Sequence, residues 1–411
     1  YSDGREAAFR YNKRGELVEL KDWNGTATME YGLTGRLAKV TDHEGRVTGY
    51  AYDAAGNRTG ITYPDGNTVG YAYDRDGRLV SVTDGEVQAV QYGYDAAGNI
   101  LTMKRPGSTA DYTYNAVRQP VKAVYRFDGG MSMEETFGYD MSGRIAGRER
   151  SGNVPGMTES TSYVYDILGR LVSYRDGQST EAYTYDASGN RTGRSVDGIT
   201  EAVCQYNEWN QLTGRTENGM PYSYGYDRRG NLTEERCGDS VIRKYVYDAA
   251  GRMVQGHNLE NGETTEYFYN ALGMRVRNMQ TRTGAEGPAG REISYAVDYI
   301  GGLNNDLMAY EKGVGITRAV YGHGYERVSQ KVSAWPDAPA AGTLPAAEPV
   351  TPAAVTAYLQ PDLMGSTLLA ADGQGNLLRY AERGAWGDLK APVQADAGSS
   401  VPEDSLRFTN Y

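Results

Sequence analysis

The sequence predicts an all-β protein built from repeated antiparallel β-hairpins, and three observations predict this class. A four-residue motif, Tyr-x-Tyr-Asp or a close variant, occurs thirteen times between Phe9 and Asn270. Its copies start 20 to 22 residues apart, except for intervals of 25 and 26 residues on either side of Phe137. Glycine, with 53 of 411 residues, recurs too often for long helices, and no long segment shows a period of 3.6. A fixed period of this size indicates a chain that stacks one small unit.

Each repeat is expected to contain two strands and two tight turns. In one copy, Tyr71 and Tyr73 fall on one face of a strand because side chains alternate. The following Asp74–Gly77 segment reads as a turn, and we expect Gly77 at positive φ, as we do Gly251 in a later copy. A short β-prone run then leads to Asp84–Gly85, a strong hairpin signal. The clearest copies supply these motif residues: Tyr50, Tyr52, Asp53, Tyr71, Tyr73, Asp74, Tyr92, Tyr94, Asp95, Tyr163, Tyr165, Asp166, Tyr183, Tyr185, Asp186, Tyr245, Tyr247 and Asp248.

This repeat resembles the YD repeat of Rhs proteins. That family includes bacterial polymorphic toxins, the C component of insecticidal toxin complexes and the extracellular shell of teneurins. The resemblance covers essentially the whole chain, because the segment from Tyr358 to Thr367 is similar to the family's Y-x-x-D-x-L-G-S motif. The residues that match this core motif are Tyr358, Asp362, Gly365 and Ser366. The resemblance implies a curved, spiralling YD-repeat sheet that forms a hollow shell, or part of one, around a polypeptide.

The ends of the sequence predict a piece of a larger protein. Residues 1–12 align without gaps on residues 63–74, so the chain begins in the middle of a repeat. It stops at Tyr411, within the terminal core block of the family. The resemblance implies that an aspartyl self-cleavage activity, present in many members, belongs to a stretch beyond residue 411.

We expect three regions within one extended array. Residues 1–330 form the YD-repeat hairpin array, and residues 358–411 start the Rhs-associated core of the same shell. Residues 331–357 between them include an Ala/Pro-rich stretch that we interpret as an exposed loop insertion.

The size of the predicted sheet excludes a tube filled by side chains. Thirteen hairpins give 26 strands, which at ~4.8 Å per strand make a contour of roughly 125 Å. Rolled up once, such a sheet would be about 40 Å across, whereas about eight strands already make an interior that side chains fill. The sheet must therefore enclose a space, remain an open ribbon or coil.

Composition argues against nucleic-acid binding. The net charge is 42 − 53 = −11, and the arginines are spread along the chain rather than clustered. Tyrosine outnumbers phenylalanine 35 to 5, which favours a surface of apolar rings with hydroxyls in contact with water over a dry core. In register on adjacent hairpins, such rings would form cross-strand ladders, with Tyr73 and Tyr94 in equivalent positions.

No residue pattern predicts a catalytic, metal or cofactor site. Cys204 and Cys237 read as free thiols, and His43, His257 and His323 lack a second ligand at metal spacing. Paired carboxylates are abundant, but they lie in repeat turns, where aspartate caps the backbone. Asp362, in the core motif, is the least repeat-like acidic residue.

The function we expect is structural: a shell segment of a secreted or surface protein of bacteria that encloses its own C-terminal toxin or effector. The alternative is a cell-surface adhesin that binds glycans or a protein receptor through tyrosine-rich surfaces. No enzymatic activity, cofactor, nucleic-acid partner or membrane span is expected in this piece.

Overall fold

The computed structural model describes residues 4–155, 157, 160–282, 289–300, 306–313, 315–322, 327–334, 355–361, 367–380 and 393–394. Within these residues the fold is all-β, as predicted: 34 strands belong to one sheet and there is no helix. Without a helix, the described part also lacks any helical segment that could cross a membrane.

Every strand pairs antiparallel with the next one in sequence, so the sheet is a continuous meander. The first thirteen strands are β1 (Ala8–Tyr11), β2 (Leu17–Asp22), β3 (Gly25–Tyr31), β4 (Leu37–Thr41), β5 (Val47–Tyr52), β6 (Arg58–Thr62), β7 (Thr68–Tyr73), β8 (Leu79–Asp84), β9 (Val87–Tyr94), β10 (Ile100–Arg105), β11 (Ser108–Tyr114), β12 (Pro120–Phe127) and β13 (Ser132–Tyr139). The next thirteen are β14 (Ile145–Gly152), β15 (Ser160–Tyr165), β16 (Leu171–Arg175), β17 (Thr180–Tyr185), β18 (Arg191–Val196), β19 (Ile199–Tyr206), β20 (Leu212–Glu217), β21 (Met220–Tyr226), β22 (Leu232–Cys237), β23 (Ser240–Tyr247), β24 (Met253–Asn258), β25 (Glu263–Tyr269) and β26 (Arg275–Arg282). The last eight are β27 (Ala289–Val297), β28 (Asp306–Glu311), β29 (Gly315–Tyr321), β30 (Arg327–Ala334), β31 (Val355–Pro361), β32 (Thr367–Ala371), β33 (Leu377–Tyr380) and β34 (Val393–Gln394).

Each predicted repeat forms one hairpin. We call the strand that carries the aromatic tetrad the tetrad strand, and the Asp-x-x-Gly turn after it the tetrad turn. The second strand of the hairpin is the return strand, and the turn that leads from it to the next hairpin is the return turn. Gly77 and Gly251 have φ of 78° and 76°, which confirms the predicted turn conformation. The amide of Gly77 also donates to the carbonyl of Asp74, as a tight turn requires.

A β-bulge recurs at the second aromatic position of all thirteen predicted copies. In the copy that starts at Tyr71, Ala72 pairs with Ser81 and Tyr73 pairs with Leu79, so Val80 is the extra residue of the return strand. Bulges bend a strand and increase its twist. One bulge per hairpin therefore curves the whole sheet in the same sense. The sequence interpretation predicted a curved sheet but did not foresee the bulges.

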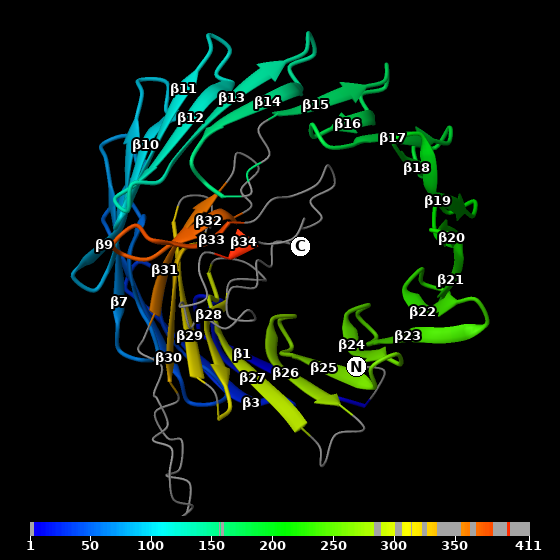
Figure 1. The fold of residues 1–411 in the computed structure, drawn as a ribbon. Coiled ribbons are helices and arrows are strands. Elements are labelled where there is room, and N and C mark those ends of the chain that lie inside the picture. The colour runs from blue at the N-terminus through cyan, green and yellow to red at the C-terminus, as the bar shows by residue number, and fades with distance from the viewer. Residues whose placement is uncertain are drawn as a thin grey trace, which may run out of the picture.

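The curved sheet coils, which decides among the three arrangements that the size estimate left open. Figure 1 shows β1 to β26 running round a ring, after which β27 to β33 follow the side of the ring already occupied by the first strands. Strand β25 contacts the β2–β3 turn, 25 − 2 = 23 strands earlier. At ~4.8 Å per strand, one revolution has a contour of about 110 Å and a diameter of about 35 Å.

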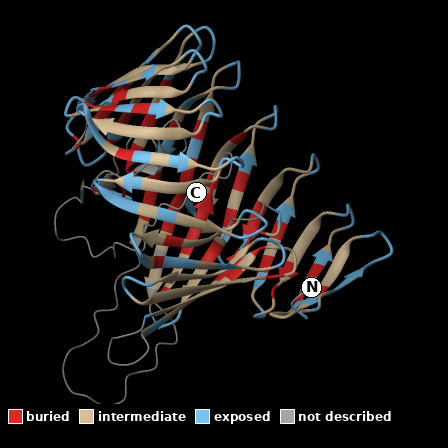
Figure 2. Ribbon diagram, turned by 90° about the vertical axis from the view of Figure 1, so that its right-hand side faces the viewer, coloured by how far each residue is buried: buried red, intermediate tan, exposed pale blue. Residues whose placement is uncertain are grey.

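Burial divides the ring into two parts. The main hydrophobic cluster joins residues of β2–β13 to residues of β27–β33. Strands β15 to β25 contribute only Tyr174, Tyr183, Ala202 and Ile242 to the buried apolar residues of the described chain. Figure 2 shows the same uneven distribution of buried positions over the strands. The ring is thus thickest where the sheet overlaps itself.

The sheet contains hairpins that the search for aromatic tetrads missed. Strand β30 pairs with β31 across the Ala/Pro-rich stretch, so the sheet continues beyond residue 357. The division into residues 1–330, 331–357 and 358–411 stays a prediction.

Candidate functional site

The tetrad aspartate organises its own turn and binds the residue four positions later. One oxygen of Asp74, Oδ1, accepts the backbone amides of Asp76 and Arg78, both at 2.9 Å. The other oxygen, Oδ2, accepts Nε of Arg78 at 2.7 Å. In other copies asparagine replaces arginine, and Asn57 Nδ2 donates to Asp53 Oδ2 at 2.9 Å. This geometry explains why the motif continues as Asp-x-x-Gly-Arg or Asp-x-x-Gly-Asn.

These hydrogen bonds stabilise the ionised turn carboxylates. The backbone amide of Arg78 and then its side chain hold the pKa of Asp74 below the usual aspartate value. A hydrogen bond from the residue four positions later is the leading cause of a lowered pKa at seven turn aspartates: Asp53, Asp74, Asp95, Asp140, Asp166, Asp186 and Asp227. At Asp248, burial opposes ionisation, but the hydrogen bonds from Arg252 outweigh it and lower the pKa.

In nine of the thirteen tetrads, the second tyrosine forms a hydrogen bond that links its hairpin to the preceding one. The hydroxyl of Tyr94 donates to the carbonyl of Leu79 at 2.6 Å, and that of Tyr73 donates to the carbonyl of Arg58 at 2.9 Å. Each acceptor is the first residue of the preceding return strand. The same bond is made in nine consecutive copies, by Tyr52, Tyr73, Tyr94, Tyr114, Tyr139, Tyr165, Tyr185, Tyr206 and Tyr226.

This bond corrects the interpretation that the tyrosine hydroxyls face water. At these nine positions the hydroxyl donates to a backbone carbonyl, which phenylalanine cannot do. Tyr73 and Tyr94 do occupy equivalent positions on adjacent hairpins, as predicted. Arginines complete the junction: the guanidinium of Arg78 lies 5.1 Å from the ring centre of Tyr94, and that of Arg170 lies 4.7 Å from that of Tyr185.

The first tyrosine of each tetrad packs inside the wall. Tyr71 and Tyr92 are 7% and 4% exposed. In the thinner part of the ring, Tyr163 and Tyr245 are only half-buried, and the rings of Tyr163 and Tyr174 lie 5.5 Å apart. None of the tetrad tyrosines from Tyr50 to Tyr269 is exposed.

A second arrangement is the seam, where strands β2–β8 and their turns contact residues of β25–β29 and the turns that follow them, in the next revolution of the sheet. The indole Nε1 of Trp23 and the side-chain Nδ2 of Asn24 donate to the backbone carbonyl of Tyr269, at 2.8 and 3.0 Å. In the opposite direction, Oδ2 of Asp22 accepts the backbone amide of Ala271 at 2.8 Å. Because these bonds involve backbone groups, they fix the register between revolutions as well as holding them together.

Buried charges reinforce the seam. Asp298 is 2% exposed and accepts Arg58 Nη1 at 2.6 Å and the hydroxyl of Tyr50 at 3.1 Å. Burial and the Asp298 carboxylate raise the pKa of Tyr50 far above its usual value. Arg318, 5% exposed, forms a bidentate ion pair with Asp84. These pairs join residues more than 230 positions apart, so no local sequence pattern could reveal them.

The structure does not bring together the other residues that the sequence analysis considered, namely the two cysteines, the core-motif residues and the histidines. Cys204 and Cys237 are free, as predicted. The register places them three strands apart, roughly 14 Å, which is too far for a disulfide. Tyr358 is buried in β31, whereas Asp362, Gly365, Ser366 and His323 lie outside the described residues. The part of the chain that is described holds no group of three potential metal ligands.

The fold and the repeat junctions define a YD-repeat β-shell. The Teneurin YD-shell model matches residues 108–286, and the RHS Repeat model matches residues 33–68 and 73–110. The chain therefore belongs to the Rhs/YD-repeat family.

Curated relatives align with parts of this chain. "Double-stranded DNA deaminase toxin A" of Burkholderia cenocepacia is 26% identical over 286 residues, which cover 68% of this chain and 19% of that protein. "Toxin protein Tse5" of Pseudomonas aeruginosa is 28% identical, over 39% of this chain and 14% of that protein. "tRNA3(Ser)-specific nuclease WapA" of Bacillus spizizenii is 31% identical, over 38% of this chain and 8% of that protein. The chain thus spans less than a fifth of the length of each of these relatives.

A solved structure shares the fold. "Crystal Structure of TcdB2-TccC3" superposes with a TM-score of 0.68 at 15% identity, covering 94% of this chain and 22% of that one. The likeness extends over nearly all of this chain.

Proposed function

We propose that this chain is a wall segment of a shell that encloses a polypeptide, namely the C-terminal toxin or effector of the same secreted bacterial protein. The closure of the spiral carries the proposal. A curved ribbon open along its length cannot keep a chain from solvent, whereas here Trp23, Asp298 and Arg318 join one revolution to the next. The names of the curated relatives, which include a deaminase toxin and Tse5, support a toxin-related role.

We assign the wall itself a structural role and no catalysis. The turn carboxylates accept backbone and side-chain hydrogen bonds within their own turns, as at Asp74, so they are poorly placed to transfer protons to a substrate. Enzymatic chemistry would then belong to other parts of the parent protein.

The adhesin alternative has less support. A glycan platform needs accessible ring faces, but the tetrad rings from Tyr50 to Tyr269 are buried or half-buried and pack within the wall. Among the described residues, the exposed aromatic side chains are Phe9 and Tyr11 on β1 and Trp209 in the β19–β20 turn, so the two groups lie far apart in the sheet order.

A fusion experiment tests enclosure. An unstructured polypeptide with one protease site is attached after Tyr411, and its rate of cleavage is compared with that of the same polypeptide alone. Enclosure predicts cleavage at least tenfold slower in the fusion. The Arg58→Ala/Arg318→Ala variant, which breaks the seam pairs, should restore fast cleavage. A matched control, Arg10→Ala/Lys39→Ala, removes two exposed cations and should leave the protease site of the fused polypeptide protected from cleavage. Equal cleavage of the fusion and the free polypeptide would refute enclosure.

A further inference from the structure

The overlap of the two revolutions identifies the inner face of the sheet. In Figure 1, strands β29 to β33 lie nearer the centre of the ring than β7 and β9. Residues of β29, β30, β32 and β33 belong to the same hydrophobic cluster as Tyr71 and Tyr92, the first aromatic residues of their tetrads. Tyr92 packs so closely against Gly322, in the turn after β29, that a Cβ there would collide with its hydroxyl. The side of the sheet that carries the first aromatic residues therefore faces the interior.

On this inner face, the return-strand residue opposite the first aromatic position changes type half-way round the ring. In the first six copies it is apolar: Leu20, Val40, Ile61, Val82, Met103 and Ala123. In the next seven copies none is aliphatic: Arg148, Tyr174, Arg194, Arg215, Glu235, Gly256 and Asn278. The six apolar residues are buried in the cluster that the second revolution covers. The change therefore marks where the wall stops packing against its own second revolution.

Ion pairs line the inner face of β17–β24, which the second revolution leaves uncovered. Three pairs join neighbouring positions: Glu181 with Arg194 at 2.7 Å, Glu217 with Arg215 at 3.1 Å and Glu235 with Arg243 at 3.1 Å. Three cations and three anions cancel, so these pairs add no net charge to the face. The arginine side chains keep 31 to 44% of their surface exposed. Covering them with an apolar surface would strip water from the charges at a high cost in free energy. This lining therefore suits a partner that stays hydrated.

The described chain itself reaches the interior. Strand β34 pairs with β33 and lies inside the ring (Figure 1). We propose that the inner face of β17–β24 is the surface on which the enclosed C-terminal polypeptide of the same protein lies, and that it holds this polypeptide as a hydrated, unpacked chain. The inference rests on the proposed function and adds where the enclosed chain is contacted and by which chemistry. Paired charges offer it hydrogen bonds without a large dry contact, so the enclosed chain stays mobile.

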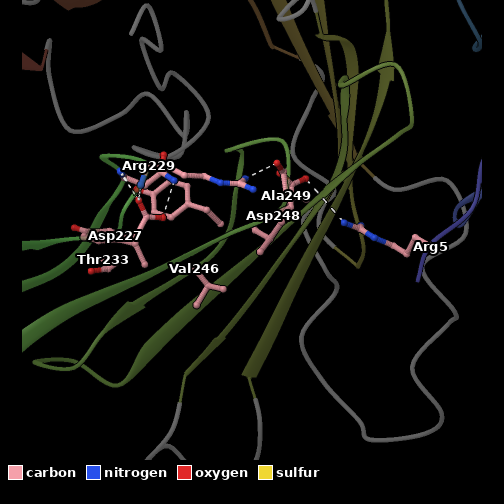
Figure 3. Close-up of a pocket in the computed structure, with 11 residues that line it drawn as sticks. Arg5, Asp227, Arg229, Thr233, Val246, Asp248 and Ala249 are labelled. Atoms are coloured by element: carbon pink, nitrogen blue, oxygen red, sulfur yellow. Dashed lines mark hydrogen bonds and ion pairs between the residues drawn. The ribbon is translucent and has the colours of Figure 1, made fainter. Parts of the chain in front are cut away.

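The hairpins of this arc are held together away from the inner-face charges. Tyr206 and Tyr226 donate to backbone carbonyls of the preceding return strands. At the rim, Arg229 in the turn after β21 donates to the carbonyl of Ala249 in the turn after β23, as Figure 3 shows. The lining can therefore be altered without removing the bonds that join one hairpin to the next.

A photo-crosslinker at neighbouring positions tests the contact. In the fusion that carries the protease site, p-benzoyl-phenylalanine replaces either Tyr224, half-buried on the inner face, or Ser223, exposed on the outer face. Irradiation should join position 224 to the appended polypeptide with at least tenfold higher yield than position 223. Equal yields, or no crosslink from position 224 while the protease site is protected, would overturn the contact and leave enclosure standing. A fusion without protection would refute enclosure and this inference with it.

A swap of the lining tests its chemistry. Glu181→Val/Arg194→Val/Glu235→Val/Arg243→Val gives the inner face the residue type of the copy that starts at Tyr71, where Val69 and Val82 hold the positions of Glu181 and Arg194. The matched control, Glu30→Val/Lys39→Val/Lys122→Val/Glu134→Val, removes two ion pairs from the outer face. Both variants are first checked for protection of the protease site, which verifies a closed wall.

Electron paramagnetic resonance then measures the mobility of the enclosed chain. A nitroxide is attached to one cysteine of the appended polypeptide, with Cys204 and Cys237 replaced by alanine. Its rotational correlation time should lengthen at least threefold in the inner-face variant and stay unchanged in the control. Equal mobility in the two variants, or a label already immobile in the unaltered wall, would overturn the proposal of a hydrated, mobile chain. The crosslink changes no charge, so it decides the contact even if the inner-face variant fails to fold.

Discussion

The tyrosine hydroxyl at the repeat junctions gives the sharpest stability prediction. In Tyr94→Phe, the ring and its packing against Arg78 remain, but the 2.6 Å bond to the carbonyl of Leu79 is lost. Loss of one such hydrogen bond costs about 1 kcal/mol. A triple variant with Tyr94, Tyr185 and Tyr226 all changed to phenylalanine should cost about 3 kcal/mol, because sites in separate hairpins are independent and their effects add.

Urea unfolding, followed by far-UV circular dichroism, measures these free energies. Tyr11→Phe is the matched control, since Tyr11 is 57% exposed on β1, and its free energy of unfolding should change by less than about 0.5 kcal/mol. Tyr94→Ala should cost more than Tyr94→Phe, because the half-buried ring is lost in addition. A triple variant as stable as the wild type would refute the reasoning that the hydroxyls hold neighbouring hairpins together.

Three further predictions concern turns and ionisable groups. Gly107→Ala should destabilise the protein more than Gly85→Ala in thermal melts: both glycines have positive φ, but a Cβ at Gly107 would lie 2.2 Å from the amide nitrogen of Gly375, whereas Gly85 has open space. The pKa values of the turn aspartates are lowered on folding, so their stabilisation is complete above the unfolded value near pH 4 and is lost as the pH falls through the folded values. The melting temperature should therefore drop below about pH 4, and a drop that begins at pH 6 would contradict this cause. Burial raises the pKa of Tyr310 to about 12. The neutral phenol therefore favours the folded state in full below the ordinary tyrosine pKa near 10, and the protein loses stability as the pH rises from there toward 12. Absorbance at 295 nm should show a class of tyrosines that ionise only near pH 12 or on unfolding, and ionisation of every tyrosine near pH 10 in the folded protein would exclude it.

The repeat unit was predictable because its signals are local. Asp-x-x-Gly turns and alternating aromatic residues act over four to eight residues, and Gly77 adopts the conformation that its turn requires. The last hairpins were missed because the search relied on aromatic tetrads. The turn at Asp372 retains the Asp-x-x-Gly-Asn-Leu pattern, and Asp372 Oδ1 accepts the amides of Gln374 and Asn376, but no tyrosine precedes it. Searching for the turn as well as the tetrad would have found it.

The seam could not be predicted from the sequence. The partners of Asp298 lie 240 and 248 positions away, and their approach depends on the curvature that accumulates over 23 strands. That curvature follows from one bulge per hairpin, and a bulge is a matter of register, which the period of the motif does not specify. The role of the tyrosine hydroxyls was missed for a related reason: their acceptors belong to the neighbouring hairpin.

Closure of the spiral is the central claim, and energy transfer between two dyes tests it most directly. Glu44 and Ser294 are in contact across the seam, with Glu44 Oε2 3.3 Å from Ser294 Oγ. Cysteines at these two positions, with Cys204 and Cys237 replaced by alanine, carry a donor and an acceptor dye. A closed spiral predicts nearly complete energy transfer in single folded molecules. In an open ribbon the dyes would lie roughly 110 Å apart, which is 23 strand spacings of ~4.8 Å each. Energy transfer close to zero would therefore contradict the closed shell.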